Sequence, residues 1–177
     1  MKKPTLTLMC GLPRSGKSSW LHRNKGDSVV VCPDVVRKEI FGHQFYTPAE
    51  GFIWAFVESM VKLLLIQKKD VVVDATSLTI GSRSRWISIG KQNGAKIRVV
   101  WVKASLKDVL KRNKRSPKDE QIPEDKLEMM SRIFMEPQED EGIELIIYRP
   151  VHKERSNGVL RKKEKEVQTK ASARKRC

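Results

Sequence analysis

The chain has 177 residues, and its 36 Lys and Arg outnumber its 21 Asp and Glu, which gives a formal net charge of +15. This length suits one domain with a buried core, and the basic excess favours polyanionic partners, with nucleic acid first; a merely soluble basic surface is the alternative. The most apolar stretch, residues 52–66, is interrupted by Glu58 and Lys62, so we expect no membrane span and no membrane partner.

The cysteines are odd in number and show no metal-binding spacing: Cys10, Cys32 and Cys177. The first two each end a predicted strand, so we expect buried, reduced thiols. Reduced thiols favour a cytoplasmic location. The apolar run near the N-terminus is short and leads into a glycine-rich loop, so we expect it to be the first strand and not a signal peptide.

In chain order, short apolar runs alternate with helical segments. The runs typical of strands are residues 5–10, 29–32, 71–73, 97–102 and 143–148. The predicted helices cover residues 17–24, 35–41, 47–67, 82–92, 106–112 and 123–135. This alternation predicts an α/β fold, a three-layer sandwich around a mainly parallel sheet of about five strands. The helix over 47–67 begins with a Thr cap and is apolar on most sides, so we expect it to be largely buried.

The composition changes near residue 151. Residues 151–177 contain ten Lys or Arg against three Glu, a net charge of +7, and few apolar residues. We therefore expect a folded domain over 1–150 and a basic, disordered tail over 151–177. Two interpretations of the tail stay open, namely an arm that raises affinity for nucleic acid by counterion release and a solubility tail or remnant of a longer protein.

The sequence after the first strand fits the phosphate-binding pattern G-x-x-x-x-G-K-[ST] without a mismatch: Gly11, Leu12, Pro13, Arg14, Ser15, Gly16, Lys17 and Ser18. A strand precedes it and a helix follows, which is the context of a P-loop. The two glycines let backbone N–H groups turn toward an anion, and the helix N-terminus favours negative charge there. We expect Lys17 to reach the β- and γ-phosphates of ATP and Ser18 to bind Mg²⁺. A chance glycine turn is the alternative.

Ligands of open α/β sheets bind at the carboxyl ends of the strands, which draws attention to the residues just after them. Asp34 follows the second strand and can either accept a hydroxyl proton during transfer or only cap the next helix. Arg37 can clamp an acceptor phosphate or be a solvated helix charge. Asp74 follows the third strand, where a carboxylate can hold Mg²⁺ through water, hold Arg37, or cap a turn.

A basic cluster over residues 111–115 occupies the place of a lid in P-loop kinases. Arg112 and Arg115 can close on the γ-phosphate and stabilise the charge spread over its oxygens. The alternative is a charged helix end, where cations are favoured by the helix dipole. We expect residues 113–122 to form a mobile loop.

These motifs together resemble the kinase domain of the phage-type 5′-polynucleotide kinases, a branch of the small P-loop kinases. The resemblance covers about residues 3–135. It rests on four motifs in order: the P-loop with Ser19-Trp20; Pro33-Asp34-Val35-Val36-Arg37; Asp74-Ala75-Thr76-Ser77-Leu78 with Arg83 and Trp86; and Leu110-Lys111-Arg112-Asn113-Lys114-Arg115 with Ile122-Pro123. The P-loop is shared by many NTPases, whereas the Asp-x-x-Arg element and the Lys-Arg-Asn lid are more specific.

The resemblance implies a role for each acceptor residue. Asp34 would be the general base on a 5′-hydroxyl, Arg37 would hold the phosphate next to that hydroxyl, Asp74 would support Arg37, and Thr76 would contact the substrate. The acid after the third strand stands one residue further from its Thr than in the family.

On the donor side, the resemblance implies that Lys17 and Ser18 bind the ATP phosphates and Mg²⁺, with Arg112 and Arg115 as catalytic lid arginines. The lid arginines are three residues apart here and four in the family's best-known member. That member also carries a C-terminal phosphatase domain, and no 3′-phosphatase activity is expected of this chain.

The sequence as a whole favours an ATP-dependent kinase that phosphorylates the 5′-hydroxyl of DNA or RNA in end repair, with ATP and nucleic-acid 5′ ends as partners. Phe41, Phe45 and Tyr46 are candidates for stacking on a base, although core packing suits Phe41 better. Two alternatives stay open: a kinase of a small molecule or nucleoside, and a nucleic-acid-binding NTPase without transferase activity. The basic charge speaks against the first, and Asp34 against the second. A homo-oligomer is compatible with the sequence, which does not fix the number of subunits.

Overall fold

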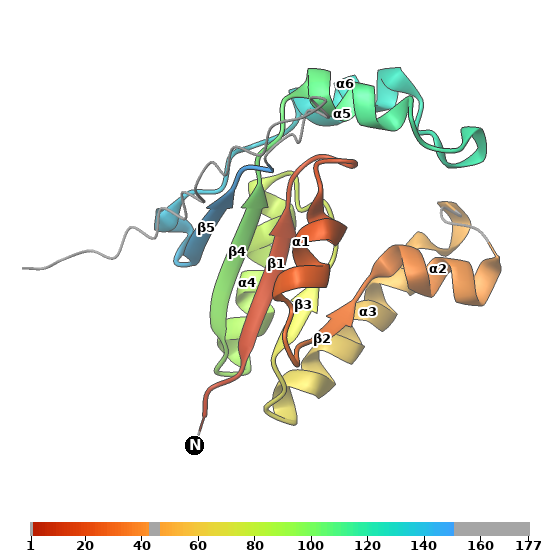
Figure 1. The fold of residues 1–177 in the computed structure, drawn as a ribbon. Helices are drawn as coiled ribbons and strands as arrows, with labels where there is room; N and C mark the ends of the chain where they lie inside the picture. Colours follow the sequence, from red (N-terminus) through yellow and green to blue (C-terminus); the bar gives the residue numbers. More distant parts are fainter. Residues whose placement is uncertain (1, 43–46, 151–177) are drawn as a thin grey trace, which may run out of the picture.

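The computed structural model describes residues 2–42 and 47–150. The expectations for Cys177, for Phe45 and Tyr46, and for the tail over 151–177 fall outside the described residues. Five strands form one sheet, parallel throughout, in the order β2-β3-β1-β4-β5 (Figure 1). Their bounds are β1 Thr5–Cys10, β2 Val29–Val31, β3 Val71–Val73, β4 Lys96–Val102 and β5 Glu144–Tyr148.

The helices form the two outer layers of the sandwich. Their bounds are α1 Lys17–Asn24, α2 Pro33–Phe41, α3 Glu50–Ile66, α4 Ile80–Gln92, α5 Leu106–Asn113 and α6 Glu124–Arg132. Helices α3 and α4 lie behind the sheet and α1 lies in front, while α5 and α6 lie beyond the carboxyl ends of the strands (Figure 1). The predicted three-layer α/β sandwich with a parallel sheet is confirmed.

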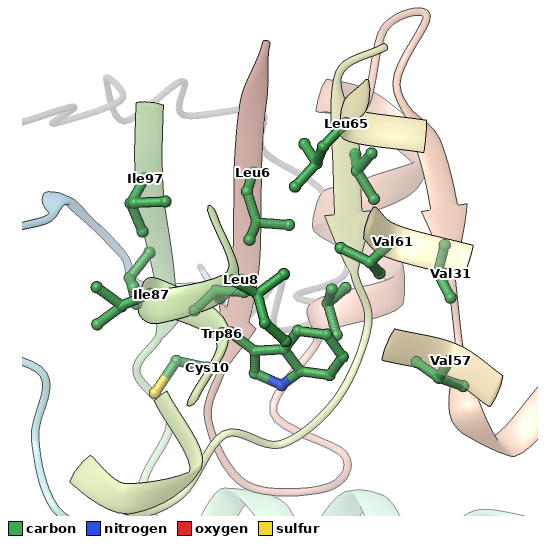
Figure 2. Close-up of a cluster of buried hydrophobic side chains, with 14 of the residues drawn as sticks. Leu6, Leu8, Cys10, Val31, Val57, Val61, Leu65, Trp86, Ile87 and Ile97 are labelled. Carbon is green, nitrogen blue, oxygen red and sulfur yellow. The ribbon is translucent and has the colours of Figure 1, made fainter. Parts of the chain in front are cut away.

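Strand β1 at the centre of the sheet shows why a nearly continuous apolar run forms there. Leu6, Leu8 and Cys10 are fully buried on the side of α3 and α4 (Figure 2). Met9 points the other way and packs with Leu21 of α1. Because side chains alternate between the two faces of a strand, a strand covered on both faces must be apolar at nearly every position. The loop that follows β1 is thereby fixed to the core.

A separate apolar cluster attaches α5 and α6 to the loops at the carboxyl edge. Leu12 of the glycine-rich loop and Leu78 of the β3–α4 loop pack with Val109 of α5 and Leu127 of α6. The last two side chains are fully buried. The two helices are therefore fixed directly over the predicted phosphate site.

Helix α3 departs from the sequence-based expectation. A short 3₁₀ turn, Thr47–Ala49, precedes it, and the α-helix begins at Glu50. We expected it to be largely buried, which is wrong, because the sheet covers one side only. The buried side chains recur every four residues: Ile53, Val57, Val61 and Leu65. The opposite side exposes Phe52, Phe56, Leu63 and Ile66. An apolar composition alone thus did not show which face is covered.

Other helix ends also differ from the prediction: helix α2 begins at Pro33, two residues before the predicted start, and α5 ends one residue late, at Asn113. Helix α4 begins two residues early because the Thr79 hydroxyl accepts from Ser82 N at 3.2 Å, while Ser82 Oγ accepts from Thr79 N at 3.1 Å. Helix α6 ends at Arg132, and beyond it Met135 N donates to Leu78 O at 2.8 Å. Within residues 2–42 and 47–150, no helix is long and apolar enough to cross a membrane.

Candidate functional site

The glycine-rich loop has the backbone of an anion cradle. Gly11 and Gly16 have φ angles of 135° and 109°, in the left-handed region that glycine tolerates. A Cβ on Gly11 would lie 2.7 Å from Val102 O, so this position has no room for a side chain. Gly16 directly precedes α1. Ser15 Oγ is buried and has no hydrogen-bond partner among the described residues, so the loop holds a donor that a bound phosphate would satisfy.

Lys17 lies at the start of α1 and folds over the loop. Its Nζ donates to Gly11 O at 3.1 Å and to Leu12 O at 2.9 Å. Burial lowers the pKa of Lys17 below its usual value, and the carboxylate of Asp74 acts in the opposite direction. The lysine therefore sits in a partly desolvated position where an additional anion would strengthen its positive charge.

Asp34 and Arg37 form an ion pair one turn apart on α2. Arg37 Nη1 donates to Asp34 Oδ1 at 2.5 Å. The Asp34 side chain is 71 % exposed, whereas that of Arg37 is only 6 % exposed. The N-cap of α2 is Cys32, and it makes no side-chain cap hydrogen bond. Asp34 is thus not the N-cap, and Arg37 is not a solvated helix charge.

A residue that the sequence did not single out holds Arg37 in place. Arg37 Nε and Nη2 donate to the two carboxylate oxygens of Glu50 at 2.6 and 2.7 Å. The guanidinium also lies over the Trp54 ring, 5.7 Å from its centroid. We expected Asp74 to support Arg37, and in the structure Glu50 does so. Glu50 is the last residue of the Thr-Pro-Ala-Glu pattern that predicts the helix start. That pattern gives no sign of a bond to Arg37, which only the packing of α2 against α3 reveals.

Asp74 follows β3 directly and lies on the Lys17 side of the site. Burial raises the pKa of Asp74, the Lys17 ammonium lowers it, and Asp34 raises it further. Helix α4 is capped by Thr79, so Asp74 is not a helix cap. Two residues further on, Thr76 O accepts from Gly11 N at 3.0 Å. The β3–α4 loop is in this way bonded to the start of the glycine-rich loop.

The lid contributes Arg112, which reaches the glycine-rich loop. Its Nη1 donates to Arg14 O at 3.0 Å and to Ser15 O at 2.7 Å. Arg14 in turn donates from Nη2 to Glu120 O at 2.6 Å. The Arg115 side chain is exposed, and no contact with this loop is seen in the part of the chain that the structure describes. Arg112 is therefore brought to the site, and the role of Arg115 stays a prediction.

The loop after α5 is closed by a side chain whose role the sequence did not show. Asn113 is 2 % exposed; its Nδ2 donates to Ile122 O at 2.7 Å, and its Oδ1 accepts from Ile122 N at 3.0 Å. These paired bonds fix both ends of the segment that we expected to be a mobile loop. The polar composition between them gave no sign of this closure.

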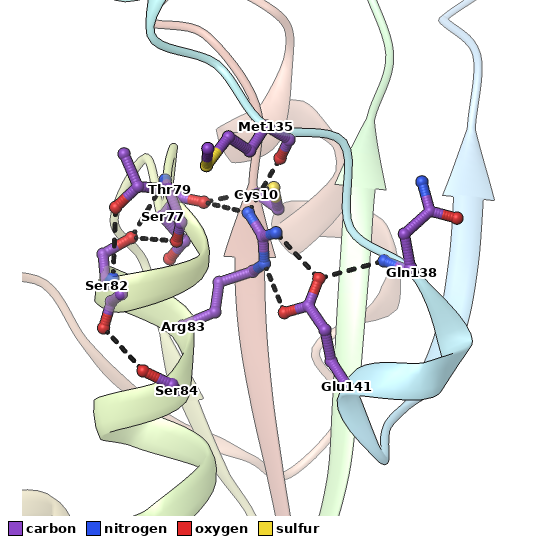
Figure 3. Close-up of polar contacts among 10 residues, drawn as sticks. Cys10, Ser77, Thr79, Ser82, Arg83, Ser84, Met135, Gln138 and Glu141 are labelled. Carbon is purple, nitrogen blue, oxygen red and sulfur yellow. Dashed lines mark hydrogen bonds and ion pairs between the residues drawn. The ribbon is translucent and has the colours of Figure 1, made fainter.

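Arg83 is a second buried arginine that sequence reasoning left without a role. It is fully buried, and Glu141 binds it through two hydrogen bonds of 2.8 and 2.7 Å (Figure 3). Its Nη1 donates to Ser77 O at 3.1 Å and to Met135 O at 2.9 Å. Burial raises the pKa of the neighbouring Cys10 thiol to about 11, which keeps it an inert core thiol as expected, whereas Cys32 is only partly buried.

The residues around the loop fit a magnesium nucleotide. The cradle has a glycine where a Cβ has no room, an unsatisfied Ser15 hydroxyl, and the cations of Lys17 and Arg112 nearby. Mg²⁺ prefers oxygen ligands, and Ser18 and Asp74 supply a hydroxyl and a carboxylate at the same edge of the sheet. Phosphate oxygens would pair with the cations and backbone N–H groups.

Comparison with known proteins supports this assignment. A family model described as an AAA domain matches residues 6–137, and no curated protein matches significantly. A chain of the Pnkp1/Rnl/Hen1 RNA repair complex is 25 % identical with a TM-score of 0.68, over 75 % of this chain and 44 % of that one. A second structure of the Pnkp1/Rnl/Hen1 complex is 28 % identical with a TM-score of 0.57, over 63 % and 40 %. The chain thus spans less than half the length of these two neighbours.

The fold also extends to small-molecule kinases. A gluconokinase from Sinorhizobium meliloti is 16 % identical with a TM-score of 0.56, over 83 % of this chain and 84 % of that one. At this identity the likeness concerns the fold alone. Family and neighbours together indicate a nucleotide-binding P-loop domain of the kinase type and leave the acceptor undetermined.

Proposed function

The chain belongs to the AAA domain family whose model matches residues 6–137, and on that basis we propose that it is an ATP-dependent kinase of polynucleotide 5′-hydroxyl ends. The observation that carries this proposal is the Asp34–Arg37 ion pair beside the phosphate cradle. A nucleotide switch needs the cradle alone, whereas a kinase also needs a base and an anchor for the acceptor.

Asp34 has the position and the freedom of a general base. It lies in the first turn of α2, just after the carboxyl end of β2, and its charge acts on both Lys17 and Asp74. Its carboxylate is accessible to an incoming hydroxyl because the side chain is mostly exposed. Arg37 orients that carboxylate by holding one oxygen, while the other oxygen is available to take a proton.

The transfer can be written with the residues of this chain. Asp34 takes the proton of the acceptor hydroxyl as the hydroxyl oxygen bonds to the γ-phosphorus of ATP. The bond from that phosphorus to the β–γ bridging oxygen breaks, and ADP leaves with the bridging oxygen. Lys17 and Arg112 both donate to carbonyl oxygens of the glycine-rich loop, and their positive charges would offset the charge that develops on the phosphoryl group. Ser18 and Asp74 would hold Mg²⁺ with a bound ATP, and the ion would supply positive charge to the phosphate oxygens.

A polynucleotide is the acceptor that best matches Arg37 and the charge of the chain. A 5′-terminal nucleotide carries a phosphate next to its free hydroxyl, which suits a guanidinium placed one turn from the base. The net charge of +15 favours a polyanion over a small metabolite. The likeness to chains of the RNA repair complex, at 25 and 28 % identity, supports the same choice. Whether the basic tail adds affinity stays a prediction.

The test is transfer of labelled γ-phosphate from ATP to a 5′-hydroxyl oligonucleotide. We expect wild type to label the oligonucleotide and Asp34→Asn to lose about 10²-fold or more in kcat, within the range of general-base catalysis. Glu39→Gln, an exposed acid on the same helix, is the matched control and should retain full activity. Labelling of small phosphorylated alcohols but not of oligonucleotides would instead support a small-molecule kinase.

A further inference from the structure

A cavity of about 350 Å³ lies behind the carboxyl end of β3, beside the proposed acceptor residues. Helices α3 and α4 and the loop between β3 and α4 enclose it. Its lining comprises Trp54, Glu58, Ala75, Thr76, Ser77, Leu78, Thr79, Ser82, Arg85 and Trp86. The volume lies within the range of small-molecule sites, roughly 300–1,000 Å³. Apart from Thr76, for which the resemblance implies a substrate contact, none of the residues assigned a catalytic or binding role above lines this space.

Two indole rings form one wall of the cavity and connect it to Arg37. The Trp54 and Trp86 centroids are 6.4 Å apart with an interplanar angle of 54°. The guanidinium of Arg37 lies 5.7 Å from the Trp54 centroid. The Trp54 ring therefore contacts the proposed phosphate anchor and also lines the cavity. A ligand that fills the cavity would lie next to a phosphate held by Arg37.

The cavity also holds polar groups that a ligand could satisfy. Ser77 is 5 % exposed, and its hydroxyl oxygen has no hydrogen-bond partner among the described residues. This hydroxyl is buried beneath the cavity surface, so the polar groups open to a ligand are those at the rim. At the rim, Glu58 forms an ion pair with Arg85, whose side chain is 63 % exposed. An apolar wall with a few fixed polar groups is the usual composition of a ligand site.

We propose that this cavity receives the base of the acceptor's 5′-terminal nucleotide, an inference that rests on the proposed function. Every base has an apolar face for the indoles and polar edges for the Glu58–Arg85 pair. Filling the cavity would place the attached sugar toward Asp34 and its 3′-phosphate toward Arg37. The base-stacking role that the sequence suggested for Phe41, Phe45 or Tyr46 then belongs to Trp54.

The experiment compares two acceptors that differ in one group. One oligonucleotide has a normal 5′-terminal nucleotide, and the other has a 5′-terminal tetrahydrofuran abasic residue with the same hydroxyl and phosphates. The ratio of their kcat/KM values is measured for wild type, Trp54→Leu and the control Phe52→Leu. Phe52 is on the same helix, is 57 % exposed and does not line the cavity. Because each ratio comes from one enzyme preparation, the active fraction cancels, and a partly unfolded variant still gives a valid ratio.

We expect wild type and Phe52→Leu to prefer the intact acceptor by about tenfold, as stacking of one base on aromatic side chains allows. In Trp54→Leu the ratio should fall to about one. If Trp54 acts only through Arg37, Trp54→Leu would lower kcat/KM for both acceptors and leave their ratio unchanged, which would overturn the proposal. Equal use of both acceptors by wild type would also overturn it. If no oligonucleotide is labelled at all, the proposed function fails, and the cavity assignment fails with it.

Discussion

Two buried arginines, Arg37 and Arg83, have similar partners and different surroundings. Each is bound through two hydrogen bonds by a glutamate, Glu50 or Glu141. The third nitrogen of Arg83, Nη1, donates to two backbone carbonyls inside the protein. The corresponding Nη1 of Arg37 donates to Asp34, whose side chain is 71 % exposed. One arginine thus faces only protein, and the other faces protein on one side and the site on the other.

The difference teaches how to separate a structural charge from a functional one. The partners of Arg83 are fixed parts of the fold, because they join α4 to the segment after α6 and to the turn before β5. One partner of Arg37, the Asp34 carboxylate, can be rehydrated or replaced, since an exposed carboxylate pairs equally well with water. Burial of the arginine is nearly the same in both cases, so exposure of the partner is the more informative quantity.

Removing Arg83 should have the largest effect. Arg83→Met leaves Glu141, which is 9 % exposed, and two carbonyls without their donor. Breaking a buried ion pair in this way costs about 3–5 kcal/mol, so we expect a free energy of unfolding lower by that amount in urea titration. Arg132→Met, which removes an arginine that is 79 % exposed, should change it by less than about 1 kcal/mol. Equal effects of the two variants would refute the structural role.

Arg112 extends the comparison to the lid, where an arginine faces the backbone carbonyls of the glycine-rich loop. Arg112→Ala should lower kcat about 10³-fold, because arginines on a transferring phosphoryl group contribute 10³–10⁵-fold. Arg115→Ala should lower it less than about tenfold, since its side chain is exposed and screened by water. Steady-state kinetics at saturating ATP measure both. A larger loss for Arg115 would mean that the lid uses its second arginine.

Arg37 should separate activity from stability. Arg37→Lys keeps the charge and loses the planar fork, so we expect kcat/KM for the oligonucleotide to fall about 10- to 100-fold with the KM for ATP unchanged. The loss of unfolding free energy should be smaller than for Arg83→Met, because Glu50 and Asp34 are 22 % and 71 % exposed. A stability loss as large as that of Arg83→Met would make Arg37 a second structural clamp.

The sequence predicted the parts of the site that depend on local patterns. The strand–loop–helix context fixed the glycine-rich loop, and the rule that ligands bind at strand carboxyl ends led to Asp34 and Asp74. β1 and α1 have the bounds predicted for them. These features need only neighbouring residues to specify them, since a short apolar run between loop residues already defines a buried strand.

Contacts between distant segments were the part that the sequence did not show. The contacts of Glu50, Asn113 and Glu141 are not visible in their local windows, because their partners lie 9 to 58 residues away. The exposed face of α3 was missed for the same reason. When most sides of a helix are apolar, its sequence does not indicate which side the sheet covers. The cavity beside Trp54 likewise needs α3 and α4 to be placed together.

The pH dependence of Asp74→Asn tests whether the ionised Asp74 carboxylate lowers the stability of the folded protein. Burial raises its pKa in the folded protein, so the folded state binds this proton more tightly than the unfolded chain. Wild-type stability then falls as pH rises from about 4 through the raised pKa. Asp74→Asn removes that fall, so the difference in Tm, variant minus wild type, should rise between about pH 4 and pH 7. For a domain of this length, each kcal/mol of this difference corresponds to roughly 2–4 °C in Tm.

Asp70 supplies a matched control with the opposite sign. Its hydrogen bond from Lys2 lowers its pKa, aided by the bond from Thr5 N at 2.7 Å. This carboxylate stabilises the fold above its unfolded pKa and loses that effect as pH falls, so the same Tm difference for Asp70→Asn should decrease as pH rises. Differential scanning fluorimetry over a pH series measures both slopes. If the Tm difference changes with pH in the same direction for Asp74→Asn and Asp70→Asn, the opposite pKa shifts of the two carboxyl groups would be contradicted. Opposite slopes would show that the ionised carboxylate beside Lys17 opposes folding, as expected of a charge that serves the proposed phosphate site.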